Sequence, residues 1–281
     1  MAGSSMKDIK LRIKSVESTM QITKAMQLVA TSKLRRAKER MENSKPYAAI
    51  AESAMKAVVR SCADGNIPFA EQRELKKLCL VVIAGERGLA GGYNANVFKC
   101  AAQEAEGKDY CVLPIGRKAI EKYERMGVQL LDNSHSHVEG LSVSACYHLA
   151  RKLVDGYTAG DFDQVKLIYT DFHSMLSQEV KSAQLLPIEP PADDEPHSGS
   201  TVYEPEAAET LAAVIPDFLA GRLYNAVCDS YASEVSARRT AMDSATKNAG
   251  EMISSLSLQY NRARQGAITQ EITEIVAGAE H

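Results

Sequence analysis

The stretch DFLAGRLYNAVCDSYASEVSARRTAMDSATKNAGEMISSLSLQYNRARQGAITQEITEIVA, residues 217–277, decides the fold. It contains no proline and is rich in residues that favour helices, so it predicts one continuous α-helix. At about 1.5 Å per residue this helix would be roughly 90 Å long, about twice the width of a domain of this size. We therefore expect most of it to protrude from any globular core and to need a partner.

Two sections of this helix carry apolar stripes. The first has the 3-4-3-4 spacing of a coiled-coil seam and consists of Met242, Ala245, Ala249, Met252 and Leu256. The second lies at the end of the helix, where a terminus normally frays, and consists of Ile268, Ile272, Ile275 and Val276. Such a stripe usually marks a surface that another protein covers, although a tip folded back onto its own chain would also bury it.

A second long helix is predicted near the start of the chain, from Lys7 to Arg60, with Pro46 as its only interruption. Its apolar stripe begins at Ile9, Ile13, Val16 and Met20 and then changes phase through Ile22, Met26 and Val29. A single helix is marginally stable without tertiary packing. Antiparallel pairing of the two long helices is therefore the simplest way to bury both stripes.

The first 45 residues are basic, with eleven Lys and Arg against four Asp and Glu. The densest part, KLRRAKER at residues 33–40, could bind nucleic acid, but it has no interleaved aromatic residues and it contains Glu39. A charged outer face of a coiled coil is the preferred interpretation. We therefore expect no nucleic-acid partner.

The composition, 45% hydrophobic and 25% charged, is ordinary for a soluble protein. No apolar run approaches ~18 residues, and MAGSSMKDIK lacks the apolar core of a signal peptide, so no direct membrane insertion is expected. The six cysteines are scattered without metal-binding spacing. They are interpreted as reduced core residues of a cytosolic protein.

The middle of the chain changes to alternating strands and helices. LCLVVI at residues 78–83 is a short apolar run followed by a glycine, which is typical of a strand buried on both faces. Further segments of this kind are CVLPIG, VQLL, VKLIYTDF and EVKSAQLLPI. The pattern predicts a small, mostly parallel, Rossmann-like α/β domain at 75–190 between long coiled-coil helices at 1–60 and 207–281, with a polar loop at 191–206.

A glycine-rich turn, Gly85 to Gly92, follows the first strand, where dinucleotide phosphates bind in Rossmann enzymes. Its spacing is G-x-x-G-x-x-G-G, no Walker lysine follows, and Gly116 and Arg117 stand where an acidic ribose ligand is expected. Tight packing of a helix on the sheet explains the glycines as well. His135 and His137 lie in a turn without a third metal ligand, so we expect no catalytic residue, cofactor or metal.

Three segments together resemble the γ subunit of F-type ATP synthases: MKDIKLRIKSVESTMQITKAMQLVATSKLRRAKERMENSKPYA, GERGLAGGYNANV and SLQYNRARQGAITQEITEIVAGAE. The resemblance runs from about Lys7 to Glu280, and the bacterial form fits best. It implies a non-catalytic rotor shaft whose terminal helices form an antiparallel coiled coil inside the α3β3 hexamer. It also implies an α/β domain at the foot, beside the ε subunit and the c-ring, at the cytoplasmic face of the bacterial membrane.

The resemblance assigns partner-binding roles to four residues of the shaft. Arg264 and Gln265 in NRARQ match positions that meet a loop of the β subunit, and Thr269 lies close by. Met26 in ITKAM matches a rotor position that faces the same region. These four residues are the expected contacts with the β subunit.

At the foot, Tyr203 and Glu204 in VYEPE match positions that contact the c-ring and ε.

Two other functions compete with the rotor on the sequence alone. One is a Rossmann-like nucleotide-binding enzyme that uses Gly85 to Gly92, and the other is a DNA-binding protein that uses the basic first helix. The coupling ion, the working direction and the resting angle of a rotor are open.

Overall fold

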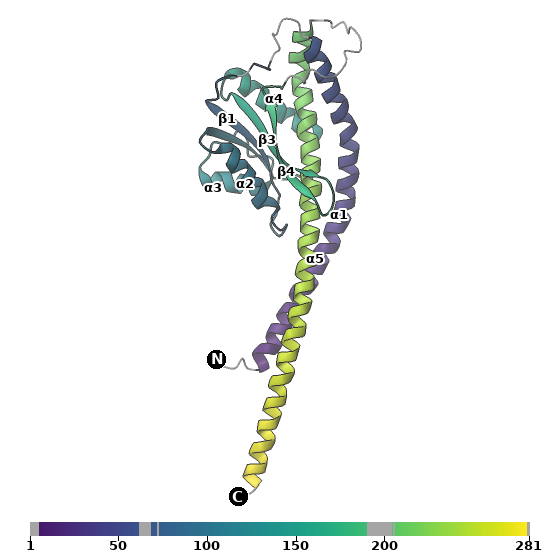
Figure 1. Cartoon of the computed structure of the whole chain (residues 1–281), viewed down its shortest axis with the longest axis vertical. Helices are drawn as coiled ribbons and strands as arrows, with labels where there is room; N and C mark the ends of the chain where they lie inside the picture. Colours follow the sequence, from purple (N-terminus) through teal and green to yellow (C-terminus); the bar gives the residue numbers. More distant parts are fainter. Residues whose placement is uncertain (1–5, 62–68, 72, 190–203, 205, 280–281) are drawn as a thin grey trace. The chain divides into compact units, whose positions relative to one another are not determined.

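The computed structural model describes residues 6–61, 69–71, 73–189, 204 and 206–279 (Figure 1). The contacts divide the chain into two compact units. Unit 1 combines residues 1–32 with residues 238–281, and unit 2 contains residues 33–237. The predicted loop at 191–206 lies almost entirely outside the described residues.

Two long helices contribute to both units, as the sequence predicts. Helix α1 runs from Met6 to Ser61 and helix α5 from Ala207 to Ala279. Helix α1 continues through Pro46, whose ring lies on the exposed side of the helix. Helix α5 extends toward the N-terminus beyond the proline-free stretch 217–277 and includes Pro216, in its third turn. A proline removes one backbone hydrogen bond and bends a helix, but tertiary packing can hold the helix together across it.

Unit 2 is built on a four-stranded sheet in the order β2-β1-β3-β4. Its strands are β1 (Lys77–Ile83), β2 (Asp109–Ile115), β3 (Gln164–Phe172) and β4 (Gln178–Leu186). Strand β1 pairs in parallel with β2 and β3, and β4 pairs with β3 as an antiparallel hairpin. The mostly parallel sheet is confirmed. The VQLL segment makes one isolated bridge, Val112 to Leu130, and is not a full strand.

Three shorter helices belong to the sheet: α2 (Tyr93–Ala105), α3 (Arg117–Met126) and α4 (Val143–Ala159). Leu78, Leu80 and Val82 of β1 form a fully buried core with α2 and α3. Alternate β1 residues point to the opposite face and are equally buried. Helix α4 lies on that side together with α5 (Figure 1). Burial of both faces explains why β1 is a continuous apolar run.

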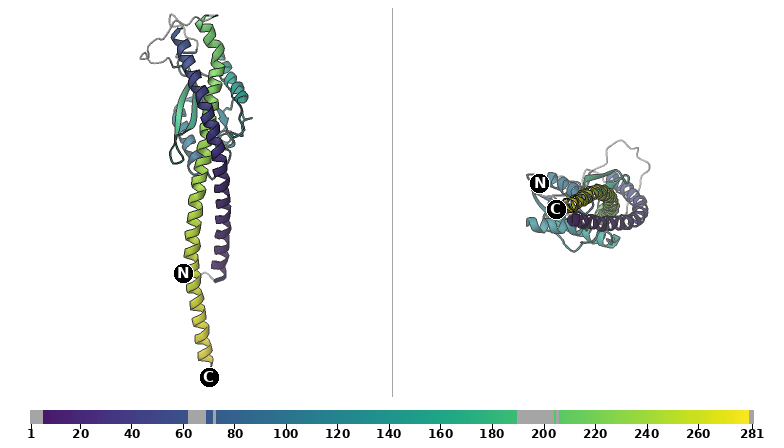
Figure 2. Two further views of the ribbon diagram at one scale, coloured as in Figure 1. Left: turned by 90° about the vertical axis from the view of Figure 1, so that its right-hand side faces the viewer. Right: turned by 90° about the horizontal axis from the view of Figure 1, so that it is seen from below.

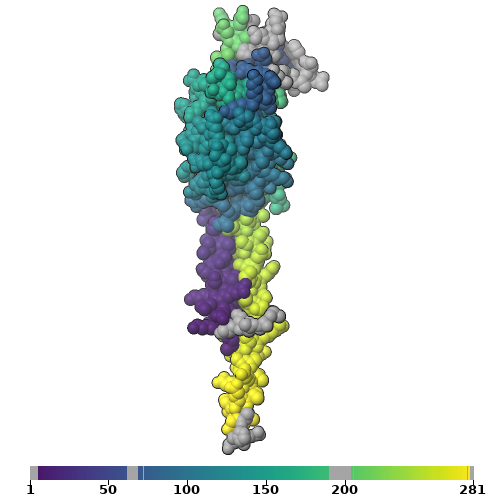
Figure 3. Space-filling model, turned by 90° about the vertical axis from the view of Figure 1, so that its left-hand side faces the viewer, coloured from purple at the N-terminus to yellow at the C-terminus, as the bar shows by residue number. Residues whose placement is uncertain are grey.

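In unit 1, residues 6–32 of α1 lie beside α5 (Figures 2 and 3). The predicted start of the α1 stripe is confirmed, because Ile9 is buried and Ile13, Val16 and Met20 are half-buried. The predicted change of phase is wrong, since Ile22 and Val29 are exposed. The 4-3 spacing continues instead through small or polar residues, Thr23 and Ala30, which a search for apolar residues passes over.

The seam of α5 that faces α1 also agrees only in part with the predicted one. Met242, Ala249 and Leu256 are buried, as predicted, whereas Met252 is 46% exposed. Ile253 takes the place of Met252 as a half-buried residue of the seam. The seam is partly polar, because the Thr23 and Thr246 hydroxyl oxygens lie 2.8 Å apart and Gln27 donates to Asp243 at 2.9 Å. A coiled-coil seam can therefore include polar layers that the apolar pattern does not reveal.

Candidate functional site

The place where an α/β fold normally binds its ligand lies at the carboxyl ends of β1 and β3. The chain leaves β1 toward β2 on one side, and β3 pairs with β1 on the other side. Such a switch in strand order opens a crevice in open parallel sheets, and ligands bind there. The turn from Gly85 to Gly92 follows β1 at this edge. A nucleotide-binding enzyme would use this crevice.

Helix α5 occupies this crevice with its own side chains. The Thr170 amide of β3 donates to the Ser230 hydroxyl at 3.1 Å, and the Ser233 hydroxyl donates to the Thr170 carbonyl at 3.4 Å. A Cβ placed on Gly85 would lie 2.6 Å from the Glu234 carboxylate. All three α5 residues are buried. The crevice is therefore filled by the polypeptide itself.

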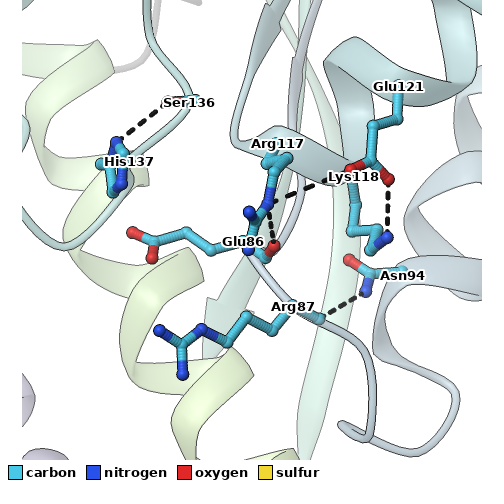
Figure 4. A network of polar contacts seen from close by, with 8 residues as sticks. All are labelled: Glu86, Arg87, Asn94, Arg117, Lys118, Glu121, Ser136 and His137. Carbon is cyan, nitrogen blue, oxygen red and sulfur yellow. Dashed lines mark hydrogen bonds and ion pairs between the residues drawn. The ribbon is translucent and has the colours of Figure 1, made fainter.

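The backbone of the glycine-rich turn is also occupied by internal contacts (Figure 4). The Gly85 amide donates to Asn94 Oδ1 at 2.8 Å, and Lys118 N donates to the Gly85 carbonyl at 3.0 Å. Arg117 Nε donates to the Glu86 carbonyl at 3.1 Å, and Asn94 Nδ2 donates to the Arg87 carbonyl at 3.3 Å. The Gly85 amide, which a phosphate cradle would use, already has a partner.

The first residue of α2 also contacts α5 beside the crevice. Tyr93 is buried and its hydroxyl donates to the Ser230 carbonyl at 3.1 Å. Gly85 is required by packing, but Gly88 has no atom near the place of a Cβ, so packing explains only part of the turn. Together these contacts favour a structural role and do not favour the nucleotide-binding alternative.

The basic segment of α1 is anchored on the α/β unit rather than lying wholly on an outer face. Arg40 donates from Nε to the Tyr224 hydroxyl at 3.0 Å, from Nη1 to the Glu139 carbonyl at 2.5 Å and from Nη2 to the Leu141 carbonyl. Lys33 forms an ion pair of 2.5 Å with Glu139. Burial opposes ionisation of Glu139 more strongly than any single neighbour favours it, but the Lys33 hydrogen bond and the charges of Lys33 and Arg36 contribute to a net lowering of the pKa of that carboxyl. Lys33 and Arg40 are thus engaged within the protein, and Lys38 Nζ lies 5.3 Å from the centre of the Phe172 ring.

The expected β-contact residues near the end of α5 lie together and are exposed. Arg264 and Gln265 are adjacent, and the Thr269 hydroxyl donates to the Gln265 carbonyl at 2.9 Å. Met26 does not join them, because it lies on α1 next to Gln27, whose partner on α5 is Asp243. The 21 positions from 243 to 264 span about 30 Å of helix. The expected contacts therefore form two separate sites.

Of the two residues expected to contact the c-ring and ε, Glu204 is exposed and Tyr203 lies outside the described residues. The apolar stripe at the end of α5 is also exposed, from 43% at Ile268 to 65% at Ile275. Helix α5 remains helical to Ala279 and does not fold back. The prediction of an uncovered apolar tip is confirmed.

Sequence reasoning missed an exposed apolar line on α1. It contains Leu11, Ile22 and Val29, all more than half exposed. Because these residues are out of phase with the buried seam, they point away from α5. The apparent change of phase in the sequence was the available signal: two apolar stripes on one helix indicate two covered faces.

No group of His, Cys, Asp and Glu that could hold a metal ion occurs in the described parts of the chain. By length and composition, α5 is apolar enough to cross a membrane, with a mean hydropathy of 1.2 in its best window. Of that window, 56% is buried inside the protein. A core helix of a soluble protein passes the same test, so this is weak evidence for a membrane span.

Known proteins resemble the chain over nearly its whole length. The protein family described as ATP synthase matches residues 5–281. The ATP synthase gamma chain of Ruminococcus albus is 45% identical over 277 residues, which cover 97% of this chain and 96% of that protein. The gamma chain of Heliobacterium modesticaldum is 40% identical, with 98% of each chain covered.

A solved structure agrees with these relatives. The central stalk and c-ring structure of the Tetrahymena thermophila mitochondrial ATP synthase contains a chain that is similar with a TM-score of 0.61 and 25% identity. The similarity covers 80% of this chain and 99% of that one.

Proposed function

The chain belongs to the ATP synthase γ chain family, and from this premise we propose that it is the central rotor shaft of an F-type ATP synthase. In this role it couples rotation of the ion-driven c-ring to ATP synthesis or hydrolysis at the α3β3 sites. The observation that carries the proposal is the end of α5, which is helical to Ala279 and exposes an apolar stripe. A stripe of this kind suits an apolar sleeve in which a shaft turns.

The filled crevice supports the same proposal independently. A rotor needs a rigid connection between its α/β unit and its long helices, and α5 supplies one at Thr170 and Gly85. We propose that this subunit carries no catalytic group of its own and that nucleotides bind elsewhere in the complex. The DNA-binding alternative is not favoured, because Lys33 and Arg40 are engaged within the protein.

The contacts with partners follow from the exposed groups. We propose that Arg264, Gln265 and Thr269 meet a β subunit, and that Met26 faces the β subunits at a separate level. Glu204, together with Tyr203, would contact the c-ring and ε at the foot. We propose accordingly that the protein lies at the cytoplasmic face of the bacterial membrane, bound through the c-ring and without inserting into the lipid.

Arg264 and Gln265 are proposed to act as a rotary latch. They lie beside Ile268 and Ile272, at the edge of the apolar stripe, and the Arg264 guanidinium has no ion-pair partner among the described residues. A guanidinium that enters a dry interface needs an acceptor, preferably a carboxylate. A hydrogen bond to a charged group contributes roughly 1.5 to 3 kcal/mol, enough to hold one rotary position and to be released at the next step.

The test is a double variant, Arg264→Ala with Gln265→Ala, in the assembled complex. Gel filtration should show an intact complex, because the apolar contacts of the tip remain. ATP turnover should change several-fold, since ~1.4 kcal/mol corresponds to a factor of ten in rate.

A matched control exists on the same helix, where Gln259 and Arg262 are also exposed. Gln259→Ala with Arg262→Ala removes the same two side-chain types from positions six and two residues earlier in the helix and should leave turnover close to wild type. If the Arg264 and Gln265 variant hydrolyses ATP and pumps ions like wild type, or if both pairs change turnover equally, the latch does not exist.

A further inference from the structure

Three polar side chains connect α1 to α5 inside unit 2. Ser44 of α1 lies 3.0 Å from Asn225 of α5, measured from Oγ to Oδ1. Asn225 Nδ2 in turn donates to Asp229 Oδ2, one turn along the same helix, at 3.2 Å. Ser44 and Asp229 are buried, with Asp229 only 3% exposed. None of these groups belongs to the crevice or the tip described above.

The Ser44 hydroxyl has more acceptors than it can serve. Its oxygen lies 2.8 Å from the Met41 carbonyl and 3.0 Å from Asn225 Oδ1. A hydroxyl has one proton, so it donates to one of these oxygens at a time. Two hydrogen-bond arrangements are therefore compatible with the same positions of the heavy atoms.

In the first arrangement, Ser44 donates to Asn225 Oδ1 and Asn225 Nδ2 donates to an ionised Asp229. In the second, the Asn225 amide is turned by 180°, so its nitrogen donates to Ser44, and Ser44 donates to the Met41 carbonyl. The Asn225 oxygen then faces Asp229 Oδ2. Two oxygens at this distance attract only if one carries a proton, so the second arrangement requires a neutral Asp229.

The surroundings of Asp229 decide between the two arrangements. Its other oxygen, Oδ1, is buried without a hydrogen-bond partner among the described residues. Burial, followed by the charge of Asp171, raises the pKa of Asp229 to about 6. Lys181 opposes this rise, but it already forms an ion pair of 2.5 Å with Asp171.

Charged and titratable groups face Asp229 from every element packed against it. They are Lys45 of α1, Tyr169 and Asp171 of β3, His173 of the β3–β4 turn, Lys181 of β4 and Cys228 of α5. His173 lies 3.6 Å from Asp171 and 3.5 Å from Glu179, so its charge is also shared with other carboxylates. Lys45, whose charge also lowers the pKa of Asp229, is an exposed residue of α1.

We propose that Asp229 is a buried proton-binding site and that its protonation reverses the hydrogen-bond chain from Asp229 through Asn225 to Ser44. The neutral acid donates to Asn225, Asn225 donates to Ser44, and Ser44 donates to the Met41 carbonyl. When the proton leaves, the chain runs in the opposite direction and ends on a buried carboxylate. The contact between α1 and α5 in unit 2 thereby responds to pH just below neutral.

The test follows the Asp229 carboxyl carbon by NMR in the full-length isolated chain between about pH 4 and about pH 8. The resonance should titrate near pH 6, and the side-chain amide of Asn225 should change with the same midpoint. In Asp229→Asn the Asn225 amide should not respond to pH. If that variant does not fold, the wild-type titration alone still tests the proposal, because the side-chain resonances of Asp229 and Asn225 are assigned through the backbone of the wild-type chain.

Asp217→Asn serves as the matched control, because Asp217 is an exposed carboxylate of the same helix. It should leave both titrations unchanged. A carboxyl of Asp229 that titrates near the ordinary value of 3.8 would overturn the proposal, and so would an Asn225 amide that ignores pH. The inference concerns contacts within unit 2 and does not depend on the proposed function.

Discussion

Replacing Gly116 by alanine tests whether the glycines around the crevice are required by geometry. Gly116 joins β2 to α3 at a φ of 96° and a ψ of 140°, a region that residues with a Cβ rarely adopt. A Cβ at this position would lie 2.0 Å from the Ala84 carbonyl oxygen, which belongs to the backbone and cannot rotate away.

The magnitude of the effect follows from two costs. A strained backbone conformation costs roughly 1–3 kcal/mol, and an overpacked core costs roughly another 1–3 kcal/mol. We expect Gly116→Ala to lower the free energy of unfolding by about 4 kcal/mol. For a domain of about 200 residues this lowers the midpoint of thermal unfolding by about 10 °C.

Urea unfolding of the isolated full-length chain, followed by circular dichroism, measures this difference. Gly88→Ala is the matched control, because no atom lies within 4 Å of its Cβ position, and we expect a change within about 0.5 kcal/mol. Gly85→Ala should fall between them, since the Glu234 carboxylate that it meets is the end of a side chain. If Gly116→Ala is as stable as wild type, or if Gly88→Ala costs as much, the geometric reasoning fails.

Two further predictions concern the seam of α5 and the pKa of Asp132. Met242→Ala should destabilise the chain by about 2 kcal/mol in urea unfolding, whereas Met252→Ala should change stability by less than about 0.5 kcal/mol, because Met242 is 4% exposed and Met252 46%. Equal losses would contradict the assigned seam. Burial opposes ionisation of Asp132, but hydrogen bonds from Lys152 and Ser134 outweigh it and hold the pKa of that carboxyl well below its ordinary value. A lowered pKa stabilises the fold above the unfolded value of about 3.9 and loses this effect as pH falls. Asp132→Asn should therefore lower stability at neutral pH by roughly 1–2 kcal/mol and flatten its decline in acid; an unchanged acid profile would refute the assignment.

Local patterns in the sequence determined the elements of this protein. Whether a segment forms a helix or a strand depends largely on interactions between near neighbours in the chain. The absence of proline from residues 217–277 and the uninterrupted apolar run of β1 therefore predicted helix α5 and a buried strand directly. The same holds for the exposed apolar tip, because a continuous helix carries its end away from its start. The motifs at both ends were long enough to indicate the family.

Only the tertiary structure decided which residues meet. Thr23 and Ala30 enter the seam because their partner helix comes close there, and nothing in their own hydropathy distinguishes them from surface residues. The filling of the crevice by Ser230, Ser233 and Glu234 depends on contacts between segments more than 50 positions apart. The chain Ser44–Asn225–Asp229 joins the two long helices across an even longer separation. Burial and hydrogen-bond partners are properties of such distant pairs, so the role of a polar residue was decided by the fold rather than by its own neighbours in sequence.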